Sequence, residues 1–175
     1  RLVSIAMSLG LLDSKLPPDA GEARPIVRET RRALSLALAE LRELTQGIYP
    51  SVLTERGLAA ALDDLCRRAA LPAHLECSLV ERVAPAVETA AYFVVSEALT
   101  NAVKHAHATE VRVSVSCAEE VVLIEVVDDG IGGARASGGS GLRGMTDRAE
   151  ALGGTLSLSS PPGRGTRLQA QIPCE

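Results

Sequence analysis

The sequence predicts an α+β fold: a two-layer α/β sandwich in which helices cover one face of a mixed sheet, preceded by an α-helical hairpin. Three observations support this prediction. Two apolar seams with steps of three or four residues occupy the first 48 residues, short alternating stretches follow from Leu75 onward, and a long apolar helix separates two of them. The chain has 175 residues, 46% of them hydrophobic, which is enough for a buried core.

Residues 1–48 are predicted to form two amphipathic helices that pack as a hairpin. Leu2, Ile5, Leu9, Leu12 and Leu16 recur every three or four residues until Pro17 and Pro18 end the pattern. A second apolar seam, within residues 27–48, has the same spacing. A hairpin cannot bury both of its faces alone, so we expect a homodimer in which two hairpins form a four-helix bundle. The alternative is a hairpin packed on its own domain. The second seam consists of Val27, Thr30, Leu34, Ala37, Leu41, Leu44 and Ile48.

Residues 49–56 are predicted to be a linker, and residues 57–175 a single domain. Its strands are recognised by alternation of apolar and polar residues, and its helices by apolar spacing and by proline or glycine at their ends. The expected helices are Gly57–Leu71, Pro85–Ala106 and Leu142–Leu152, and the expected strands are Leu75–Val80, Val111–Val115, Val121–Val127, Thr155–Ser159 and Thr166–Ile172.

Composition excludes several classes of function. A formal net charge of −4 argues against nucleic-acid binding. No apolar run reaches the length of about 18 residues that a membrane span needs, so we expect no direct membrane contact and a cytoplasmic location, within a parent protein that could itself be anchored. The four cysteines (Cys66, Cys77, Cys117 and Cys174) show no C-x-x-C spacing. We expect them to be small apolar residues in a reducing compartment, and not disulfides or a zinc site.

The predicted helix 85–106 carries the first candidate functional residues. At about 3.6 residues per turn, Glu97, Asn101 and Lys104 share one stripe, with His105 at its edge. Asn101 can supply an oxygen ligand to Mg²⁺, Lys104 can offset phosphate charge, and Glu97 can orient a water or accept a proton. A solvated Glu/Lys face is the commoner meaning of such a stripe, so the helix alone defines no site. The opposite face is predicted to be apolar, with Val95, Ala98, Leu99, Ala102 and Val103.

Two glycine clusters follow this helix. In the first, an apolar strand leads to Asp128, where a buried carboxylate could accept a hydrogen bond from the exocyclic amine of adenine. Gly130 and Gly132 would let the backbone approach a planar base. An ordinary turn after a strand is the alternative, because Asp-Gly is common in turns.

The second cluster, Gly139-Ser140-Gly141-Leu142-Arg143-Gly144, fits G-x-G-x-x-G, but its context does not fit a dinucleotide-binding fold. It does not directly follow a strand, and the next strand ends in Ser159-Ser160-Pro161 without an acid for a ribose. What it provides is a glycine loop at a helix N-terminus, where free N–H groups favour phosphate and Arg143 could assist. A flexible linker is the alternative.

Taken in order, these motifs resemble those of the ATP-binding catalytic domain of bacterial sensor histidine kinases, which has the gyrase/Hsp90-like Bergerat fold. Glu97-x-x-x-Asn101 looks like the N box of that family, Asp128-x-Gly130-x-Gly132 like the first glycine box, and Gly139-x-Gly141-Leu142 like the second. Gly163-Arg164-Gly165-Thr166 is similar to the closing Gly-x-Gly-Thr. The resemblance covers essentially the whole chain. It is closest to the nitrate- and desiccation-type kinases, through Gly47-Ile48-Tyr49-Pro50 and Gly141 to Met145.

The resemblance implies an ATP-dependent protein-histidine kinase of a two-component system. Asp128 would contact adenine and Thr166 would lie near it, while Asn101 would hold Mg²⁺ with the phosphates. Lys104, His105, Leu142 and the backbone of residues 139–144 would complete the nucleotide site. Glu97 would assist attack by a histidine, and the phosphoryl group would pass to an aspartate of a response-regulator receiver domain.

The resemblance also implies that the phosphoacceptor histidine belongs to a stretch before Arg1-Leu2, because His74, His105 and His107 do not occupy its position. We therefore expect this chain to bind ATP without phosphorylating itself. Two alternatives stay open: an anti-sigma-type serine kinase, which would not need the heptad hairpin, and a degenerate ATP-binding dimerisation module. The retained Glu97, Asn101 and Asp128 argue against the second.

Overall fold

The computed structural model describes residues 51–134 and 140–174, together with Leu12, Val27 and Thr30. The chain divides into two compact units, Arg1–Tyr49 and Pro50–Glu175. The predicted helical hairpin lies outside the described residues, apart from those three isolated positions, so the bundle and the dimer remain predictions. Within the described part, no helix is both long and apolar enough to span a membrane.

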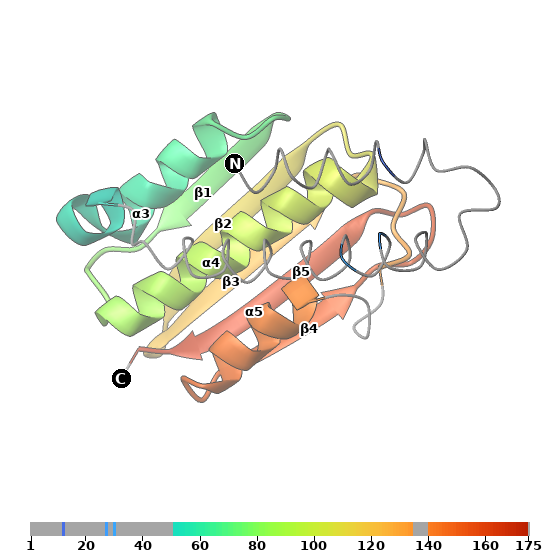
Figure 1. The fold of residues 1–175 in the computed structure, drawn as a ribbon. Coiled ribbons are helices and arrows are strands. Elements are labelled where there is room, and N and C mark those ends of the chain that lie inside the picture. Colours follow the sequence, from blue (N-terminus) through green and yellow to red (C-terminus); the bar gives the residue numbers. More distant parts are fainter. Residues whose placement is uncertain (1–11, 13–26, 28–29, 31–50, 135–139, 175) are drawn as a thin grey trace. The chain divides into compact units, whose positions relative to one another are not determined.

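The second unit is built on one five-stranded mixed sheet with the strand order β1-β2-β3-β5-β4 (Figure 1). Strand β1 pairs with β2 in parallel, and all other neighbouring strands are antiparallel. The strands are β1 (Ala73–Ser78), β2 (Val111–Ala118), β3 (Val121–Asp128), β4 (Thr155–Ser159) and β5 (Thr166–Pro173).

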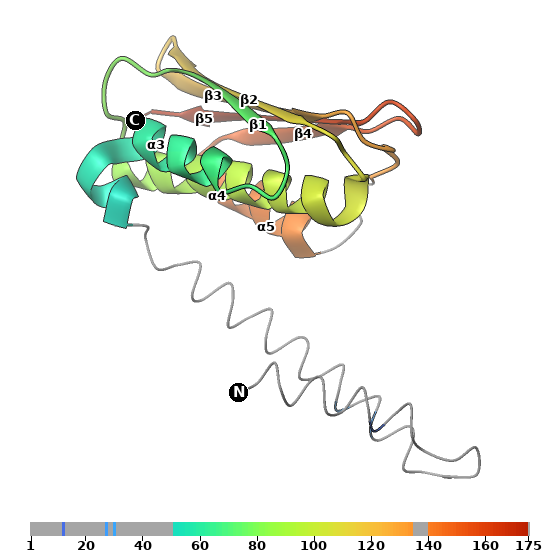
Figure 2. The same ribbon diagram turned by 90° about the horizontal axis from the view of Figure 1, so that it is seen from above.

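Three helices, α3 (Ser51–Arg67), α4 (Pro85–Asn101) and α5 (Ser140–Glu150), lie on the same face of this sheet (Figure 2). Alternation along the strands sends every second side chain towards them, as the buried Val111, Val113 and Val115 of β2 illustrate. The core between the two layers is aliphatic. The predicted α+β sandwich is therefore confirmed.

Helix α3 begins earlier than the sequence indicated, because Ser51 to Arg56 are helical although a linker was expected there. Gly57, with φ 83° and ψ 178°, interrupts the helix. The interruption makes room for Arg82, since a Cβ at Gly57 would lie 2.8 Å from Arg82 Cδ. Arg82 donates a hydrogen bond of 3.2 Å to the carbonyl oxygen of Leu53, a buried core residue. The first turns of α3 are thus anchored to the domain.

Candidate nucleotide-binding site

Helix α4 places Glu97 and Asn101 at partly exposed positions, while Val95, Ala98, Leu99 and Ala102 are buried as the apolar pattern predicted. Val103 does not follow that pattern: it is 45% exposed. The physical reason is a change of helix type, because Ala102–Ala106 forms a π-helical segment, η1, directly after Asn101. A π-turn uses i→i+5 hydrogen bonds and so rotates the following side chains away from α-helical spacing.

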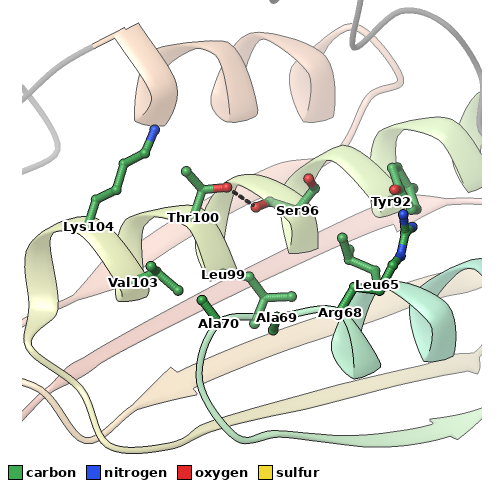
Figure 3. Close-up of a pocket in the computed structure, with 10 residues that line it drawn as sticks. All are labelled: Leu65, Arg68, Ala69, Ala70, Tyr92, Ser96, Leu99, Thr100, Val103 and Lys104. Carbon is green, nitrogen blue, oxygen red and sulfur yellow. Dashed lines mark hydrogen bonds between the residues drawn. The ribbon is translucent and has the colours of Figure 1, made fainter.

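The same π-turn determines where the two candidate phosphate-binding cations lie. Lys104 and His105 are both exposed and both belong to η1, so the stripe expected for Lys104 with Glu97 and Asn101 continues from α4 into the π-helical segment. In Figure 3, the Lys104 side chain extends from η1 towards the side on which α5 lies. The segment ends at His107, which adopts the left-handed conformation with φ 51°.

Asp128 is the last residue of β3 and lies opposite Thr166, the first residue of β5. Its Oδ1 accepts hydrogen bonds from the backbone N–H groups of Gly130, at 2.9 Å, and Thr166, at 3.2 Å. Asp128 is partly exposed and not fully buried as expected. Among the described residues no donor reaches Oδ2, so this oxygen can accept a hydrogen bond from a ligand.

Asp129 holds the neighbouring loop in place, a role that the sequence analysis missed. Its carboxylate accepts hydrogen bonds from the Thr109 hydroxyl, from Thr109 N at 2.7 Å and from Glu110 N at 3.1 Å. The Thr109 hydroxyl, followed by the backbone N–H groups of Glu110 and Thr109, lowers the pKa of Asp129 to about 2. These bonds connect the loop after β3 to the segment between η1 and β2. Sequence gave no signal beyond the Asp-Asp-Gly turn.

Two positions of the first cluster need glycine because neighbouring backbone atoms leave no room for a Cβ. A Cβ at Gly130 would lie 2.3 Å from the carbonyl oxygen of Ala106, which accepts a hydrogen bond of 2.8 Å from Ile131 N. At Gly132, where φ is 64°, a Cβ would lie 2.2 Å from the carbonyl oxygen of Pro161. We expected these glycines to admit a planar base. In the structure they allow the loop after β3 to pack against η1 and the β4–β5 turn.

Ser160, in the β4–β5 turn, is the second residue that the sequence analysis missed. Its Oγ lies 3.0 Å from Thr166 Oγ1 and accepts a hydrogen bond of 3.0 Å from Ala134 N. Its carbonyl oxygen accepts a bond of 2.8 Å from Gly133 N. Ser160 therefore positions Thr166 and connects the glycine loop after β3 to the end of the sheet at which Asp128 lies.

The second glycine cluster is described from Ser140 onward, and Gly139 lies outside the described residues. Helix α5 starts at Ser140, two residues earlier than predicted. Gly141 lies against α4, because a Cβ there would be 2.0 Å from Glu97 Oε1. Leu142 packs against the hydrophobic core and Arg143 is exposed. A Cβ at Gly144 would have no neighbour within 4 Å.

These contacts bring three separate segments to one end of the domain. Gly141 meets Glu97, Gly130 meets the end of η1, and Asp128 meets Thr166. The resulting site combines the acceptor oxygen Oδ2 of Asp128, the partly buried amide of Asn101 and the carboxylate of Glu97. The exposed cations Lys104 and Arg143 lie beside the N-terminus of α5. Such a set can bind a nucleotide base at Asp128 and phosphate near α5. Of the described residues, no three His, Cys, Asp or Glu side chains cluster as metal ligands.

A separate groove of about 430 Å³ lies between α3 and α4 (Figure 3). It is lined by Leu65, Arg68, Ala69, Ala70, Tyr92, Ser96, Leu99, Thr100, Val103 and Lys104. Lys104 is the one residue that it shares with the predicted nucleotide site, so this groove is not that site.

The chain is similar in sequence to proteins of a known family. The sequence profile of the histidine kinase-, DNA gyrase B- and HSP90-like ATPases matches residues 86–175. The oxygen sensor histidine kinase NreB of Staphylococcus carnosus is 31% identical over 183 aligned positions, covering 99% of this chain and 52% of NreB. The nitrate/nitrite sensor protein NarQ of Escherichia coli is 34% identical over 175 positions, covering 93% of this chain and 30% of NarQ. The chain thus spans about half or less of these relatives.

Solved structures show the same fold. The histidine kinase domain of a blue-light activated histidine kinase from Erythrobacter litoralis aligns with a TM-score of 0.53 at 21% identity, covering 99% of this chain and 86% of that one. The histidine kinase AdeS of Acinetobacter baumannii aligns with a TM-score of 0.52 at 17% identity. These two likenesses show the fold, and the profile match over residues 86–175, just over half of the chain, identifies the family. The chain belongs to the histidine kinase-, DNA gyrase B- and HSP90-like ATPases.

Proposed function

We propose that this chain is the catalytic part of a two-component sensor histidine kinase, which binds Mg-ATP and transfers the γ-phosphoryl group to a histidine of the dimerisation hairpin. The observation that carries the proposal is the hydrogen bonding of the Asp128 carboxylate. Two backbone N–H groups fix its Oδ1, and Oδ2 has no donor among the described residues. A fixed acceptor at the end of a strand can select the exocyclic amine of adenine.

The phosphates would lie towards α4 and the N-terminus of α5. Backbone N–H groups at the start of α5 and the exposed Lys104 supply positive potential there, with Arg143 and His105 at its rim. Asn101 would give one oxygen ligand to Mg²⁺, and phosphate oxygens and waters would supply the others, an arrangement that magnesium commonly adopts with nucleotides. The bound ion would neutralise phosphate charge.

Glu97 is assigned the proton-handling role. Its carboxylate lies where the first turn of α5 meets α4, since Gly141 leaves room for Oε1. A carboxylate there can accept the proton of an attacking imidazole or orient it, and the rest of the rate enhancement would come from positioning and charge neutralisation. The relative NreB is named a sensor histidine kinase, which supports the same chemistry for this chain.

The partners are assigned through those relatives. We propose a homodimer formed by residues 1–48, followed by transfer of the phosphoryl group to a response-regulator receiver domain. The long heptad seam favours this assignment over an anti-sigma-type switch, which would not need it.

Calorimetric titration with ADP and a non-hydrolysable ATP analogue, in the presence of Mg²⁺, tests the nucleotide site. In Asp128→Asn, the remaining amide oxygen still accepts the two backbone N–H groups, so the fold is retained, but an NH₂ group replaces Oδ2. We expect the Kd to rise at least about tenfold. Asp147→Asn, which removes one exposed carboxylate of α5, is the charge-matched control. Equal affinity in wild type and Asp128→Asn would overturn the adenine assignment.

A further inference from the structure

Two of the four cysteines form a pair at the end of the sheet opposite to the nucleotide site. Cys117 lies near the end of β2 and Cys174 follows β5 directly, and their Sγ atoms are 3.4 Å apart. Cys174 N donates a hydrogen bond of 2.7 Å to the carbonyl oxygen of Glu120, in the turn between β2 and β3. The two thiols are separated by 57 positions in the sequence, which is why spacing gave no sign of the pair.

The sheet itself fixes this proximity. Cys117 pairs with Val122 of β3, and Val122 pairs with Ile172 of β5. Glu119 and Glu120 form a tight turn with φ of 51° and 61°, so the end of β5 passes close to the last residues of β2. The pair is therefore held by backbone hydrogen bonds on both sides and does not depend on a mobile loop.

We propose that Cys117 and Cys174 are a site of oxidative modification, at which thiol–disulfide exchange with a small-molecule disulfide such as oxidised glutathione joins β2 covalently to the end of β5. In the first step, the Cys117 thiol loses its proton and attacks the reagent, forming a mixed disulfide and releasing one thiol. In the second, Cys174 attacks Cys117 Sγ, releases the second thiol and forms the intramolecular bond. The two cysteines are oxidised and the reagent is reduced to two thiols.

Exposure determines the order of the two steps. Cys117 is exposed and Cys174 is partly buried, packed against the hydrophobic core. Burial, followed by the hydrogen bond with Cys117, raises the pKa of the Cys174 thiol to about 11. Less thiolate is therefore present at Cys174 near neutral pH, and an external reagent meets Cys117 first. Closing the present Sγ–Sγ distance to a bonded length of about 2.0 Å needs only a small side-chain movement.

This modification is independent of the proposed function. Val122, the partner of Cys117, and Asp128 lie six residues apart on β3, which places the pair about 20 Å from Asp128 at roughly 3.4 Å per residue. The other two cysteines provide the comparison: Cys66 is buried and Cys77 is partly buried. Burial, followed by the Asp63 charge, raises the pKa of Cys66 to about 11, so it too is a poor nucleophile.

The test is incubation of the folded wild-type chain with oxidised glutathione, followed by alkylation, intact mass measurement and peptide mapping. Cys117→Ser and Cys174→Ser are compared with Cys77→Ser as the matched control, and circular dichroism verifies that each variant is folded. We expect wild type and Cys77→Ser to form a Cys117–Cys174 disulfide carrying no glutathione. The Cys174→Ser variant should accumulate glutathione at Cys117. In the Cys117→Ser variant, glutathione should modify Cys174 at least tenfold more slowly than the wild type forms its disulfide.

Three results would overturn the proposal. Glutathione that stays on Cys117 in the wild type would show that Cys174 does not resolve the mixed disulfide. Pairing of either residue with Cys66 or Cys77 would show that the contact in the folded chain does not direct the chemistry. Rapid modification of Cys174 in Cys117→Ser would show that Cys117 does not react first.

Discussion

Gly141 lies against the carboxylate of Glu97, so that a Cβ at position 141 would be 2.0 Å from Glu97 Oε1. This contact joins the first turn of α5 to α4, two helices that are separated in the sequence by η1 and the strands β2 and β3. The nearest atom is the end of a flexible side chain. A side chain at position 141 would therefore displace the Glu97 carboxylate more readily than it would unfold the domain.

Gly141→Ala is expected to reduce phosphoryl transfer in the full kinase by at least about tenfold while changing the free energy of unfolding by less than about 1 kcal/mol. The reason is displacement of Glu97 from its position beside α5. Transfer is measured with labelled ATP and stability by urea denaturation. Gly144→Ala is the matched variant in the same helix, because its Cβ would meet nothing within 4 Å. If Gly144→Ala lost as much transfer as Gly141→Ala, the contact with Glu97 would not be the cause.

Local patterns predicted most of the fold. Alternation placed four of the five strands within two residues of their observed ends, since each strand of this sheet has one buried face and one exposed face, and β2 continues three residues beyond its expected end. The glycine clusters and Asp128 were singled out because loops at strand and helix ends have strong residue preferences, and their part in nucleotide binding stays a prediction. The η1 segment was not predicted, because nothing in Ala102–Ala106 distinguishes a π-turn from another turn of α-helix.

Contacts between distant segments account for what the sequence did not reveal. Asp129 acts through Thr109, twenty positions away, and Ser160 through Ala134 and Thr166. Each is an ordinary turn residue in its own segment: Asp129 meets Thr109 only once β2 and β3 are paired, and Ser160 meets Ala134 only once β3 and β5 are paired. The Gly130 requirement is of the same kind, because the atom that excludes a Cβ belongs to Ala106.

Gly130→Ala is expected to destabilise the domain by about 2 kcal/mol. Its Cβ would lie 2.3 Å from the Ala106 carbonyl oxygen, a backbone atom that cannot move aside without losing the hydrogen bond from Ile131 N. Gly133→Ala separates this clash from backbone strain: φ there is 82° but no atom lies within 4 Å of the Cβ, so a cost of about 1 kcal/mol is expected. Urea denaturation of both variants measures the difference, and equal costs would contradict the steric explanation.

Asp129→Asn is expected to lower the free energy of unfolding at neutral pH. It should also make that free energy fall less steeply as the pH is lowered into the acid range. The folded-state pKa of Asp129 is lowered from 3.8 to about 2 by its bonds to Thr109 and Glu110. A lowered pKa contributes stability that is present above the ordinary value and lost as pH falls towards about 2. Urea denaturation at several pH values measures this loss. Asp147→Asn controls for removal of a charge, and an identical fall towards acid pH in wild type and Asp129→Asn would contradict the prediction.

Arg82 and Glu88 form a bidentate ion pair, with N–O distances of 2.6 and 2.7 Å, in which the Glu88 side chain is only 2% exposed. Arg82→Met leaves that carboxylate buried without its partner, and we expect a loss of about 2 kcal/mol, reduced from the fully buried case because Arg82 is 53% exposed.

Removing both charges should cost less than removing one, because the Arg82→Met, Glu88→Met double variant has no buried carboxylate to desolvate. We expect the double variant to regain at least half of the loss in urea denaturation. Arg167→Met, at the more exposed pair with Glu125, is the control and should cost less than about 1 kcal/mol. A double variant as unstable as Arg82→Met would mean that the contacts of Arg82 with Leu53 and Gly57, and not its charge pairing, hold the start of α3 on the domain.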